Sequence, residues 1–484
     1  MSTGATARPE SVLGLDIGTS GVKGLALDSG GRVLAAAEAG YELSTPRPGW
    51  AEQDPEDWWE AASAVLARLQ ADAGRPAGIG LSGQMHGLVA LDATDRVLRP
   101  AILWNDQRTA AECEEIEATV GLSRLIELTG NRALPGFTAP KLLWMRANEP
   151  ELYARIARIA LPKDYVRLRL CGEHATDVAD ASGTLLLDVA ARGWSAEMLD
   201  ALSLPPAWLP AALESPQVSG HTAEGIPVAA GAGDQAAGAL GAGVDRAGGA
   251  ASVVLGTSGV VFAALERYAS DPQARVHAFC HAVPATWHAM GVMLSAAGSL
   301  AWLQRIVGGD YDTLTQEASA WAPATEGLLF LPYLAGERTP HADPDARGAF
   351  TGLELRHDRG ALVRAVLEGV AFGLRDSLDL VSELGTRPQL GRVSGGGAHS
   401  DEWLRIIASV LELPLQRVAV EDAAAFGAAL LGGVAAGVWP DVPSAVAATV
   451  RPGEVIEPVA EWIEPYRDAR ERFRALYPAL RACR

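Results

Sequence analysis

The chain has 484 residues, of which 49% are hydrophobic and 20% are charged, and its formal net charge is −19. This length predicts two large domains, and the composition is that of a globular protein and not of a disordered one. The acidic balance argues against nucleic acid and anionic membranes as partners, because both would be repelled. Any anionic ligand must be held locally, by backbone N–H groups, a few cations or a metal ion.

The spacing of the cysteines and the nature of the apolar segments indicate the cellular compartment of the protein. Four cysteines stand far apart in the sequence and predict neither a zinc site nor a disulfide framework, as is typical of a reducing cytoplasm. The polar N-terminal stretch predicts no signal peptide, and the glycine- and alanine-rich run near residues 423–438 predicts a buried helix and not a membrane span. We therefore expect a cytoplasmic protein.

The first elements follow from alternating apolar runs and turns. Runs at Val12–Asp16, Val22–Leu27 and Val33–Ala37 are separated by glycine-containing turns and predict a three-stranded antiparallel meander. A helix is expected at about residues 57–69. Further strands are expected at 78–82 and 88–91.

A four-residue string, Gly-Thr-Ser-Gly, occurs at residues 18–21 and again at 256–259. Each copy lies between two apolar runs, so we predict two related domains whose hairpin turns face a shared cleft, with chance repetition as the alternative. We place the boundary near residue 246, which gives domains 1–246 and 247–484. The second half ends in helical patterns at 361–383, 402–411 and 423–436.

The first of these turns has the residue types that hold phosphate. Glycine at Gly18 lets backbone N–H groups approach phosphate oxygens, and Thr19 and Ser20 add hydroxyl donors. Asp16 ends a strand where a carboxylate could hold Mg²⁺, and Lys23 could neutralise a phosphate. The alternative is an ordinary turn with a capping aspartate, but the second turn, with Gly256, Thr257 and Ser258, could enclose the same polyphosphate.

Residues 231–238 follow a predicted strand at 226–230 and open a helix. The pattern G-x-G-x-x-A resembles a dinucleotide fingerprint, but the acidic residue expected about 20 positions later is absent and Asp234 would face a pyrophosphate. At a helix N-terminus Asp234 is suited to stay ionised and accept a proton from a bound hydroxyl. Its position alone favours the alternative of a helix N-cap.

Three further strings are polar or glycine-rich. Gly395, Gly396 and Gly397 stand at a strand–helix junction, where adenine or ribose could lie against the backbone, unless the segment is only a flexible loop. Polar groups that could bind the hydroxyls of a sugar are offered by Gln84, His86 and Asn105, and apolar or aromatic faces for it by Met85 and Trp104, although a lone histidine is usually structural. The polar loop at residues 336–341 could border the cleft or merely cap a strand.

Several known catalytic motifs are missing from the sequence. There is no Walker A motif, no protein-kinase H-R-D or D-F-G set, and no G-x-S-x-G nucleophile elbow.

Taken in order, the motifs resemble those of the FGGY carbohydrate kinases over nearly the whole chain, and most of all the branch that phosphorylates D-xylulose. The strings that carry the resemblance are LDIGTSGVK from Leu15, EQDP from Glu52, GQMHG from Gly83, RPAILWND from Arg99, PGFTAPKLLW from Pro135, LPKDY from Leu161, LGTSG from Leu255, LAGERTPH from Leu334, and GGG from Gly395.

This resemblance implies an α/β fold of two ribonuclease-H-like, actin-type ATPase domains with a catalytic cleft between them. It implies transfer of the ATP γ-phosphate to O5 of D-xylulose, with Asp234 as general base and Asp16 near Mg²⁺ and the reacting hydroxyl. It places the sugar on Met85 and His86, the phosphates on the turns at Gly18 and Gly256, and adenosine near Gly396.

Two positions depart from the family pattern. Gln235 stands where an asparagine often follows the catalytic aspartate, so the sugar pocket can differ slightly, and Ala361 replaces an acidic or amide residue at a helix start. The alternatives are a family member acting on another ketose or polyol, and a non-enzymatic actin-like ATPase. The sequence leaves the oligomeric state open, with a homodimer as one alternative.

Overall fold

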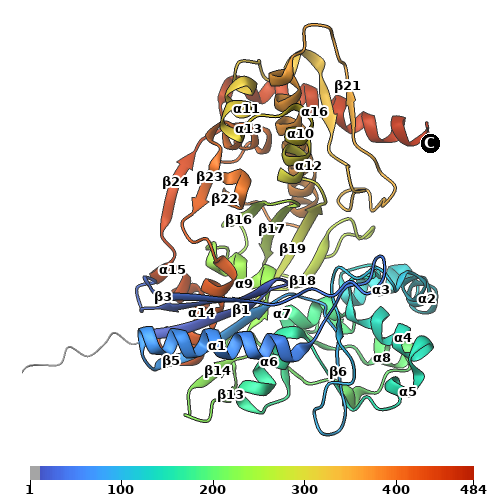
Figure 1. Cartoon of the computed structure of the whole chain (residues 1–484). Helices are drawn as coiled ribbons and strands as arrows, with labels where there is room; N and C mark the ends of the chain where they lie inside the picture. Colours follow the sequence, from blue (N-terminus) through green and yellow to red (C-terminus); the bar gives the residue numbers. More distant parts are fainter. Residues whose placement is uncertain (1–10, 484) are drawn as a thin grey trace, which may run out of the picture.

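The structure is a computed structural model, and it describes residues 11–483. Two seven-stranded mixed sheets lie one above the other with helices around them (Figure 1). The first sheet is formed by β13 (Val218–His221), β14 (Pro227–Ala229), β5 (Pro76–Gly83), β1 (Ser11–Ile17), β2 (Gly21–Leu27) and β3 (Val33–Gly40), with β15 (Ala232–Gly233) also paired to β5. The second is formed by β18 (His277–Cys280), β19 (Trp287–Met293), β17 (Gly259–Leu265), β16 (Ala250–Leu255), β22 (Leu390–Ser394), β23 (Leu415–Val418) and β24 (Pro452–Ile456).

The two sheets repeat one arrangement. In the first, β1 pairs antiparallel with β2, β2 with β3, and β1 pairs parallel with β5 on its other side. In the second, β16 pairs antiparallel with β17, β17 with β19, and β16 pairs parallel with β22. The predicted meander and both hairpins are therefore confirmed, and each Gly-Thr-Ser-Gly string connects the first two strands of its sheet.

Most helices cover the outer faces of the sheets (Figure 1). Those up to residue 241 are α1 (Pro55–Ala73), α2 (Ala110–Val120), α3 (Leu122–Thr129), α4 (Thr138–Asn148), α5 (Pro150–Tyr153), α6 (Pro162–Cys171), α7 (Val178–Ala181), α8 (Ala196–Leu202) and α9 (Asp234–Gly241). The later ones are α10 (Ala297–Val307), α11 (Tyr311–Ser319), α12 (Arg359–Glu383), α13 (Asp401–Leu411), α14 (Ala423–Ala435), α15 (Val442–Thr449) and α16 (Ala460–Arg481). Of these helices, α9 and α14 lie between the two sheets (Figure 1). Helix α1 starts where the sequence predicts, because Asp54 caps it and Pro55 occupies its first turn.

Short strands complete the fold in small two-stranded sheets. These pair β4 (Glu52–Gln53) with β7 (Ala101–Ile102), β6 (Val89–Leu91) with β8 (Arg158–Ala160), β12 (Ala211–Leu213) with β9 (Ala175–Asp177), β10 (Leu187–Asp188) with β11 (Gly193–Trp194), and β20 (Leu329–Leu331) with β21 (Ala349–Thr351). No helix within residues 11–483 is long and apolar enough to cross a membrane.

Helix α14 belongs to the second half of the sequence but packs on the first sheet. It lies against β1, β5 and α9, and it approaches the strands so closely that a Cβ on Gly80 would lie 1.8 Å from the carbonyl oxygen of Ala428. A Cβ on Gly427 would lie 1.9 Å from the carbonyl oxygen of Ala237 in α9. Glycines therefore let α14 sit directly on the backbone of the first half.

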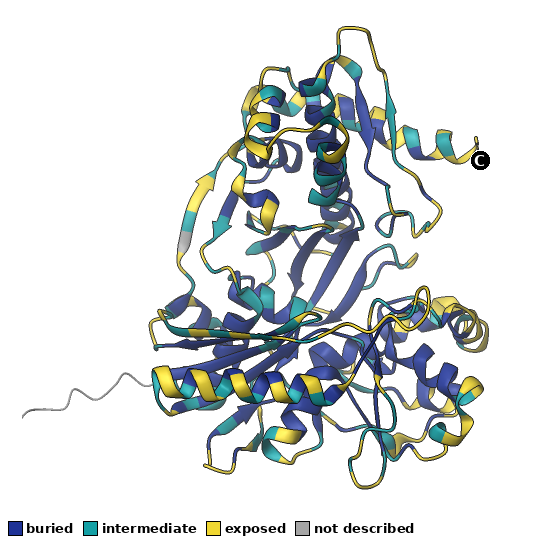
Figure 2. Cartoon of the chain, viewed as in Figure 1, coloured by how far each residue is buried: buried dark blue, intermediate teal, exposed yellow. Residues whose placement is uncertain are grey.

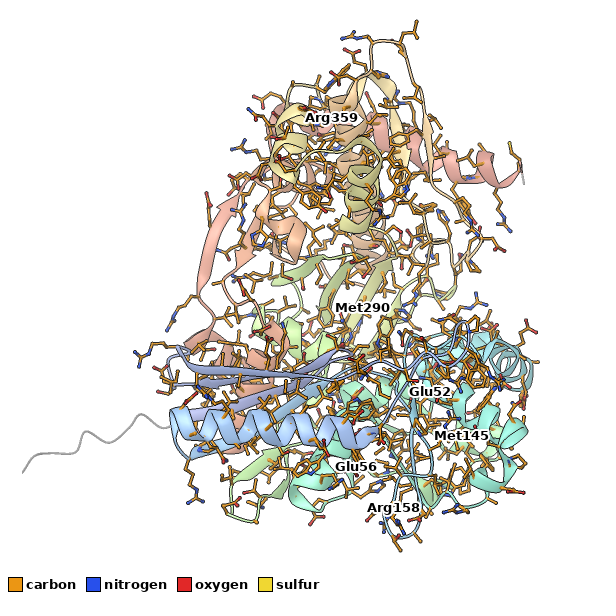
Figure 3. The ribbon with its side chains drawn as sticks, in the orientation of Figure 1. Glu52, Glu56, Met145, Arg158, Met290 and Arg359 are labelled. Atoms are coloured by element: carbon orange, nitrogen blue, oxygen red, sulfur yellow. The ribbon has the colours of Figure 1, made fainter. Side chains whose placement is uncertain are left out.

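The two halves also share apolar core at one edge. Figure 2 shows the central strands of both sheets as largely buried, whereas the edge strands β3 and β24 are partly exposed and α1 has exposed residues along its outer side. Met290 of β19, which Figure 3 labels, belongs to a buried cluster made mostly of first-half residues such as Phe137 and Leu142. The β18–β19 edge of the second sheet is thus anchored on the first half, and it positions the walls of the cleft described next.

Candidate active site

A cleft of about 710 Å³ lies between the two sheets and receives residues from both halves. Its walls come from the end of β1, the first hairpin turn, the start of α9, the inner strands of the second sheet and the segment before α14. Among the residues that line it are Asp16, Gly18, Ser20, Lys23, Glu38, Asp234, Gln235, Ser252, Val260, Phe262, Ser394, Glu421 and Asp422.

Hydrogen bonds from neighbouring segments fix the first hairpin turn. Gly18 N donates to Gly21 O (3.0 Å), and Gly18 O accepts from the hydroxyl of Tyr41 (2.5 Å). The predicted sugar ligand Gln84 is 1% exposed, and its Nε2 lies 3.3 Å from Gly18 O and 3.1 Å from the Oε1 atom of Gln53. In this structure Gln84 therefore holds the turn and does not face the cleft.

Asp16 and Asp234 are the two carboxylates at the centre of the cleft. Burial raises the pKa of Asp16 to about 6, against the opposing charge of Lys23, and its buried Oδ1 has no hydrogen-bond partner among the described residues. Burial, followed by the negative charge of Asp16, raises the pKa of Asp234 to about 7. The pair thus has one carboxylate available for a cation and one poised to exchange a proton near neutral pH.

Asp234 lies at the start of α9, but it is not the N-cap residue that its sequence position favoured. Gly233 is the N-cap residue, and Asp234 is the first residue of the helix with no side-chain capping bond. The N-cap alternative is therefore wrong. The carboxylate stays free to act on a group bound in the cleft, while the helix N-terminus favours its negative form.

Lys23 lines the cleft and forms an ion pair there with an acidic side chain. Its Nζ lies 2.7 Å from Oδ1 of Asp422, and both side chains are partly exposed. Exposed ion pairs of this kind contribute little, so a phosphate can compete for the ammonium group. Sequence reasoning missed Asp422, since only the packing of α14 on the first sheet brings that segment to the cleft.

His86 is held in a fixed orientation, but it is not among the described residues that line the large cleft. Its backbone is left-handed (φ 71°), and its carbonyl oxygen accepts from Nζ of Lys141 (2.8 Å) and Oγ1 of Thr138 (3.0 Å). Its Nδ1 lies 2.7 Å from the carbonyl oxygen of Gly183, which can only accept, so Nδ1 carries the proton. Burial lowers the pKa of His86 to about 3, so the ring is neutral and Nε2 is an acceptor for a ligand hydroxyl.

Lys141 and Thr138 are residues that sequence reasoning missed. The ammonium group of Lys141 is fully buried and also donates to Gly136 O (2.7 Å), and burial lowers its pKa well below the ordinary value. They lie within the string from Pro135 that contributes to the family resemblance, but a buried lysine bound to carbonyl oxygens has no signal in a single sequence.

A buried ion cluster supports the segment that contacts His86. Lys163 of α6 lies 2.7 Å from Asp177 and 2.9 Å from Asp180, which flank and form part of α7, and 2.7 Å from Asp164. The next segment, η1 (Ser182–Thr184), contains Gly183, whose carbonyl oxygen fixes the imidazole. Removal of a partner from such a cluster would leave an uncompensated buried charge, so it makes this wall rigid.

The remaining predicted sugar residues divide into two groups. Met85 packs against the residue before the catalytic candidate, since its Cγ lies 2.6 Å from where a Cβ of Gly233 would be. Trp104 is 44% exposed and its Nε1 donates to Oγ1 of Thr19 (3.0 Å), which joins it to the first turn. Asn105 instead lines a separate open hollow formed with residues 45–51. Met85 and Trp104 thus lie next to segments of the cleft without lining it, whereas Asn105 lines a different hollow.

A second cavity of about 550 Å³ lies in the second half. The predicted residues Gly256, Thr257, Gly396 and Gly397 line it, together with residues that sequence reasoning missed: Ala297, Gly298, Leu300 and Ala301 of α10, Tyr311, Asp312 and Thr315 of α11, and Trp403 of α13. Ser258 lies in the same turn as Thr257, and Gly395 precedes Gly396 with a φ of 89° that favours glycine. A pocket that is lined by apolar side chains on one side and by glycine backbone on another is suited to the flat base of a nucleotide and its ribose.

The cleft offers a cation few protein ligands. Within residues 11–483, no group of three or more histidine, cysteine, aspartate or glutamate side chains is arranged to hold a metal ion. A single carboxylate with a free buried oxygen, as at Asp16, fits Mg²⁺, because that ion is usually held by one or two carboxylates together with substrate phosphates and waters.

Comparison with known proteins agrees with this geometry. Residues 11–241 match the N-terminal domain of the FGGY family of carbohydrate kinases, and residues 251–436 match its C-terminal domain. The chain is 44% identical to the xylulose kinase of Escherichia coli (strain K12), over 97% of this chain and 99% of that protein. It is 36% identical to the xylulose kinase of Bacillus subtilis (strain 168), over 96% of each chain.

A solved structure is similar over the full length. The crystal structure of a xyloylose kinase from Brucella ovis superposes with a TM-score of 0.93, at 45% identity, over 98% of this chain and 100% of that one. The two-domain architecture of the chain is therefore that of a solved relative.

Proposed function

Because the chain belongs to the FGGY family of carbohydrate kinases, we propose that it transfers the γ-phosphate of ATP to O5 of D-xylulose and so forms D-xylulose 5-phosphate and ADP. The observation that carries the proposal is the place of Asp234: it starts α9 inside the cleft that the first hairpin turn also lines. The substrate is inferred from the relatives named xylulose kinase, at 44% and 36% identity over nearly the full length.

In this proposal Asp234 accepts the proton of the attacking hydroxyl. Phosphoryl transfer depends on positioning and charge stabilisation more than on covalent chemistry, so one well-placed base with a pKa near neutrality is sufficient. Met85 and His86 hold the sugar beside it, with the neutral imidazole of His86 accepting a sugar hydroxyl through Nε2. Trp104 and Gln235 border the same region. Asn105 and Gln84 do not contact the sugar in this proposal and influence it only through neighbouring residues.

ATP would span both cavities. Its phosphates would lie on the turns at Gly18 and Gly256, and its adenosine would lie in the pocket formed by Gly396 and the α10–α11 segment. Mg²⁺ held by Asp16 and the phosphates would neutralise charge that develops during transfer. We propose residues 1–246 as the sugar-binding domain and 247–484 as the nucleotide-binding domain, with α14 crossing between them.

The test is ADP release from Mg-ATP in the presence of D-xylulose, D-ribulose, L-ribulose, glycerol or gluconate. We expect strong stimulation by D-xylulose. Stimulation by a different compound in the panel would keep the reaction and change the substrate. ADP release that no compound stimulates would refute the sugar-kinase proposal in favour of an actin-like ATPase.

The dependence of activity on pH reports on Asp234. Its pKa is raised from 3.8 to about 7, and a general base acts only when deprotonated. The value of kcat/KM for the sugar should therefore fall as the pH is lowered through about 7, and remain level above it. In Asp16→Asn the residual activity should show this limb at lower pH, because the like charge is gone. A profile that is flat from about pH 5 to 8 would contradict the assignment.

A further inference from the structure

Arg338 lies in the polar loop that follows β20, and the backbone around it is tied to the second sheet. The N–H of the next residue, Thr339, donates to Val292 O at the end of β19 (2.9 Å), and its hydroxyl donates to Arg275 O (2.8 Å). On the other side, Oε1 of Glu337 accepts from the backbone N–H of Arg338 (2.8 Å). The loop is therefore anchored where β19 reaches the cleft, beside Val260, which pairs with Val292 and lines the cleft.

The guanidinium group of Arg338 has no partner. Within residues 11–483, no hydrogen bond or ion pair is formed by its side chain, although burial lowers its pKa. By contrast, the buried Arg364 lies 2.8 Å from Glu368 and 2.6 Å from Glu402. Arg338 is only partly buried, and a guanidinium group that burial penalises and that no described protein group pairs remains available to a ligand.

The adjacent carboxyl group does not supply the missing partner. Oε1 of Glu337 accepts from two backbone N–H groups, those of Leu294 (2.9 Å) and Arg338 (2.8 Å). Burial raises the pKa of Glu337 to about 8, so it is largely protonated at neutral pH. Glu337 acts to raise the pKa of Arg338, but no ion pair joins the two side chains in the described part of the chain, so this neighbour offsets the positive charge only in part.

The side chains around Arg338 indicate which part of the site it faces. The hydroxyl of Thr339, the next residue, donates to Arg275 O just before β18 begins at His277, which places the loop beside this strand. In agreement, the charge of Arg338, after burial, lowers the pKa of both His86 and His277. The ring of His86 lies 4.7 Å from that of Phe137, and the ring of His277 lies 6.0 Å from it, so the two halves of the chain meet here. The groups that shift the pKa of Asp234 are burial, Asp16 and Gln235, and do not include Arg338.

We propose that Arg338 is a substrate-binding residue contributed by the second half, which donates N–H groups to the carbonyl oxygen and an adjacent hydroxyl of a ketose. This inference rests on the proposed function. In this proposal the reacting hydroxyl would lie at Asp234 and the carbonyl end toward His86, because Met85 lies close both to Gly233, which precedes Asp234, and to Gly183, which holds the His86 ring. A planar guanidinium with parallel donors matches two neighbouring oxygens, and it distinguishes a ketone, which only accepts, from a hydroxyl.

The same geometry argues against a role on the transferred phosphate. The phosphate-binding candidates Gly18, Lys23 and Asp16 line the cleft with Asp234, whereas Arg338 lies by the imidazole of His86. A residue at the sugar's carbonyl end should change sugar recognition and leave nucleotide affinity nearly unaltered.

The experiment compares wild type with Arg338→Met, a variant of similar volume without donors, on D-xylulose and on xylitol, which has a hydroxyl in place of the C2 carbonyl. In the variant, kcat/KM for D-xylulose should fall about 10- to 100-fold, the usual value for a hydrogen bond to a charged group. The value of kcat/KM for xylitol should fall much less, so the ratio of the values for D-xylulose and xylitol should decrease strongly. The KM for ATP should change by less than about twofold. Arg338→Lys keeps the positive charge but loses the two parallel N–H donors, so its kcat/KM for D-xylulose should lie between the values of wild type and Arg338→Met.

The matched control is Arg305→Met, an exposed arginine of α10, which should leave all these values unchanged. An unchanged ketose preference in a folded Arg338→Met enzyme would overturn the assignment, as would a lower kcat with unaltered sugar KM. Thermal unfolding separates misfolding from loss of binding, and calorimetric titration with D-xylulose measures the binding directly. A wild-type enzyme that is not stimulated by any sugar would instead refute the proposed function, independently of the variants.

Discussion

Replacing Asp234 with asparagine should lower kcat by about 10²- to 10⁴-fold, the usual contribution of a general base. The amide keeps the shape of the side chain and its place at the start of α9, so the sugar and ATP should still bind. The measurement is steady-state ADP release with saturating D-xylulose and Mg-ATP, together with sugar binding by calorimetry. An Asp234→Asn enzyme with nearly normal kcat would show that another group takes the proton.

A second buried aspartate provides the control for this variant. Asp245 follows α9, burial raises its pKa, and its side chain does not belong to the lining of the large cleft in the described part of the chain. Asp245→Asn should therefore keep kcat within about twofold of wild type, since it removes a buried carboxylate without touching the reacting groups. If both variants lose activity alike, the effect of Asp234→Asn would be structural.

Replacing Gly80 with alanine should destabilise the protein strongly. The new Cβ would lie 1.8 Å from the carbonyl oxygen of Ala428, and this contact is with backbone, so the strand and α14 would have to move apart. Overpacking of this kind costs about 3 kcal/mol in the free energy of unfolding and lowers the Tm by roughly 3–6 °C. Activity should also fall, because α14 carries the cleft residues Asp422 and Ala423 at its start.

Gly193→Ala is the matched control for the glycine substitution. Gly193 lies in β11, and a Cβ there would have open space around it. Its Tm should stay within about 1 °C of wild type, as for most substitutions that create no clash. Differential scanning fluorimetry of the two variants, with and without Mg-ATP, tests the prediction. A Gly80→Ala protein as stable as Gly193→Ala would mean that α14 is not held tightly on the first sheet.

The elements with strong local signals were predictable from the sequence. Both hairpins follow from a glycine turn between apolar runs, and α1 follows from Asp54 and Pro55. The candidates Asp16 and Asp234, which the structure brings together in one cleft, stand out in the sequence because each lies at the end of a strand or the start of a helix, next to glycines. Such positions combine a local turn with a chemically active side chain, and both are visible in a single sequence.

The parts that were missed depend on contacts between distant segments. Lys141 and Thr138 act on the carbonyl oxygen of His86, and Asp422 reaches Lys23, across long sequence separations. The α10–α11 wall of the second cavity likewise has an ordinary helical sequence. No periodicity records which carbonyl oxygen a buried lysine will find, so these residues required the three-dimensional structure.

The position of α14 has a consequence for the order in which the protein can be made. The inner face of the first sheet is built from strands that end by Gly233, yet the helix that covers it ends only at Ala435. During synthesis from the N-terminus, the first sheet therefore stays uncovered on that face until α14, which ends at Ala435, has left the ribosome. The first half cannot complete its native packing alone, and chaperones that shield exposed apolar strands would act on this protein throughout the interval before α14 emerges.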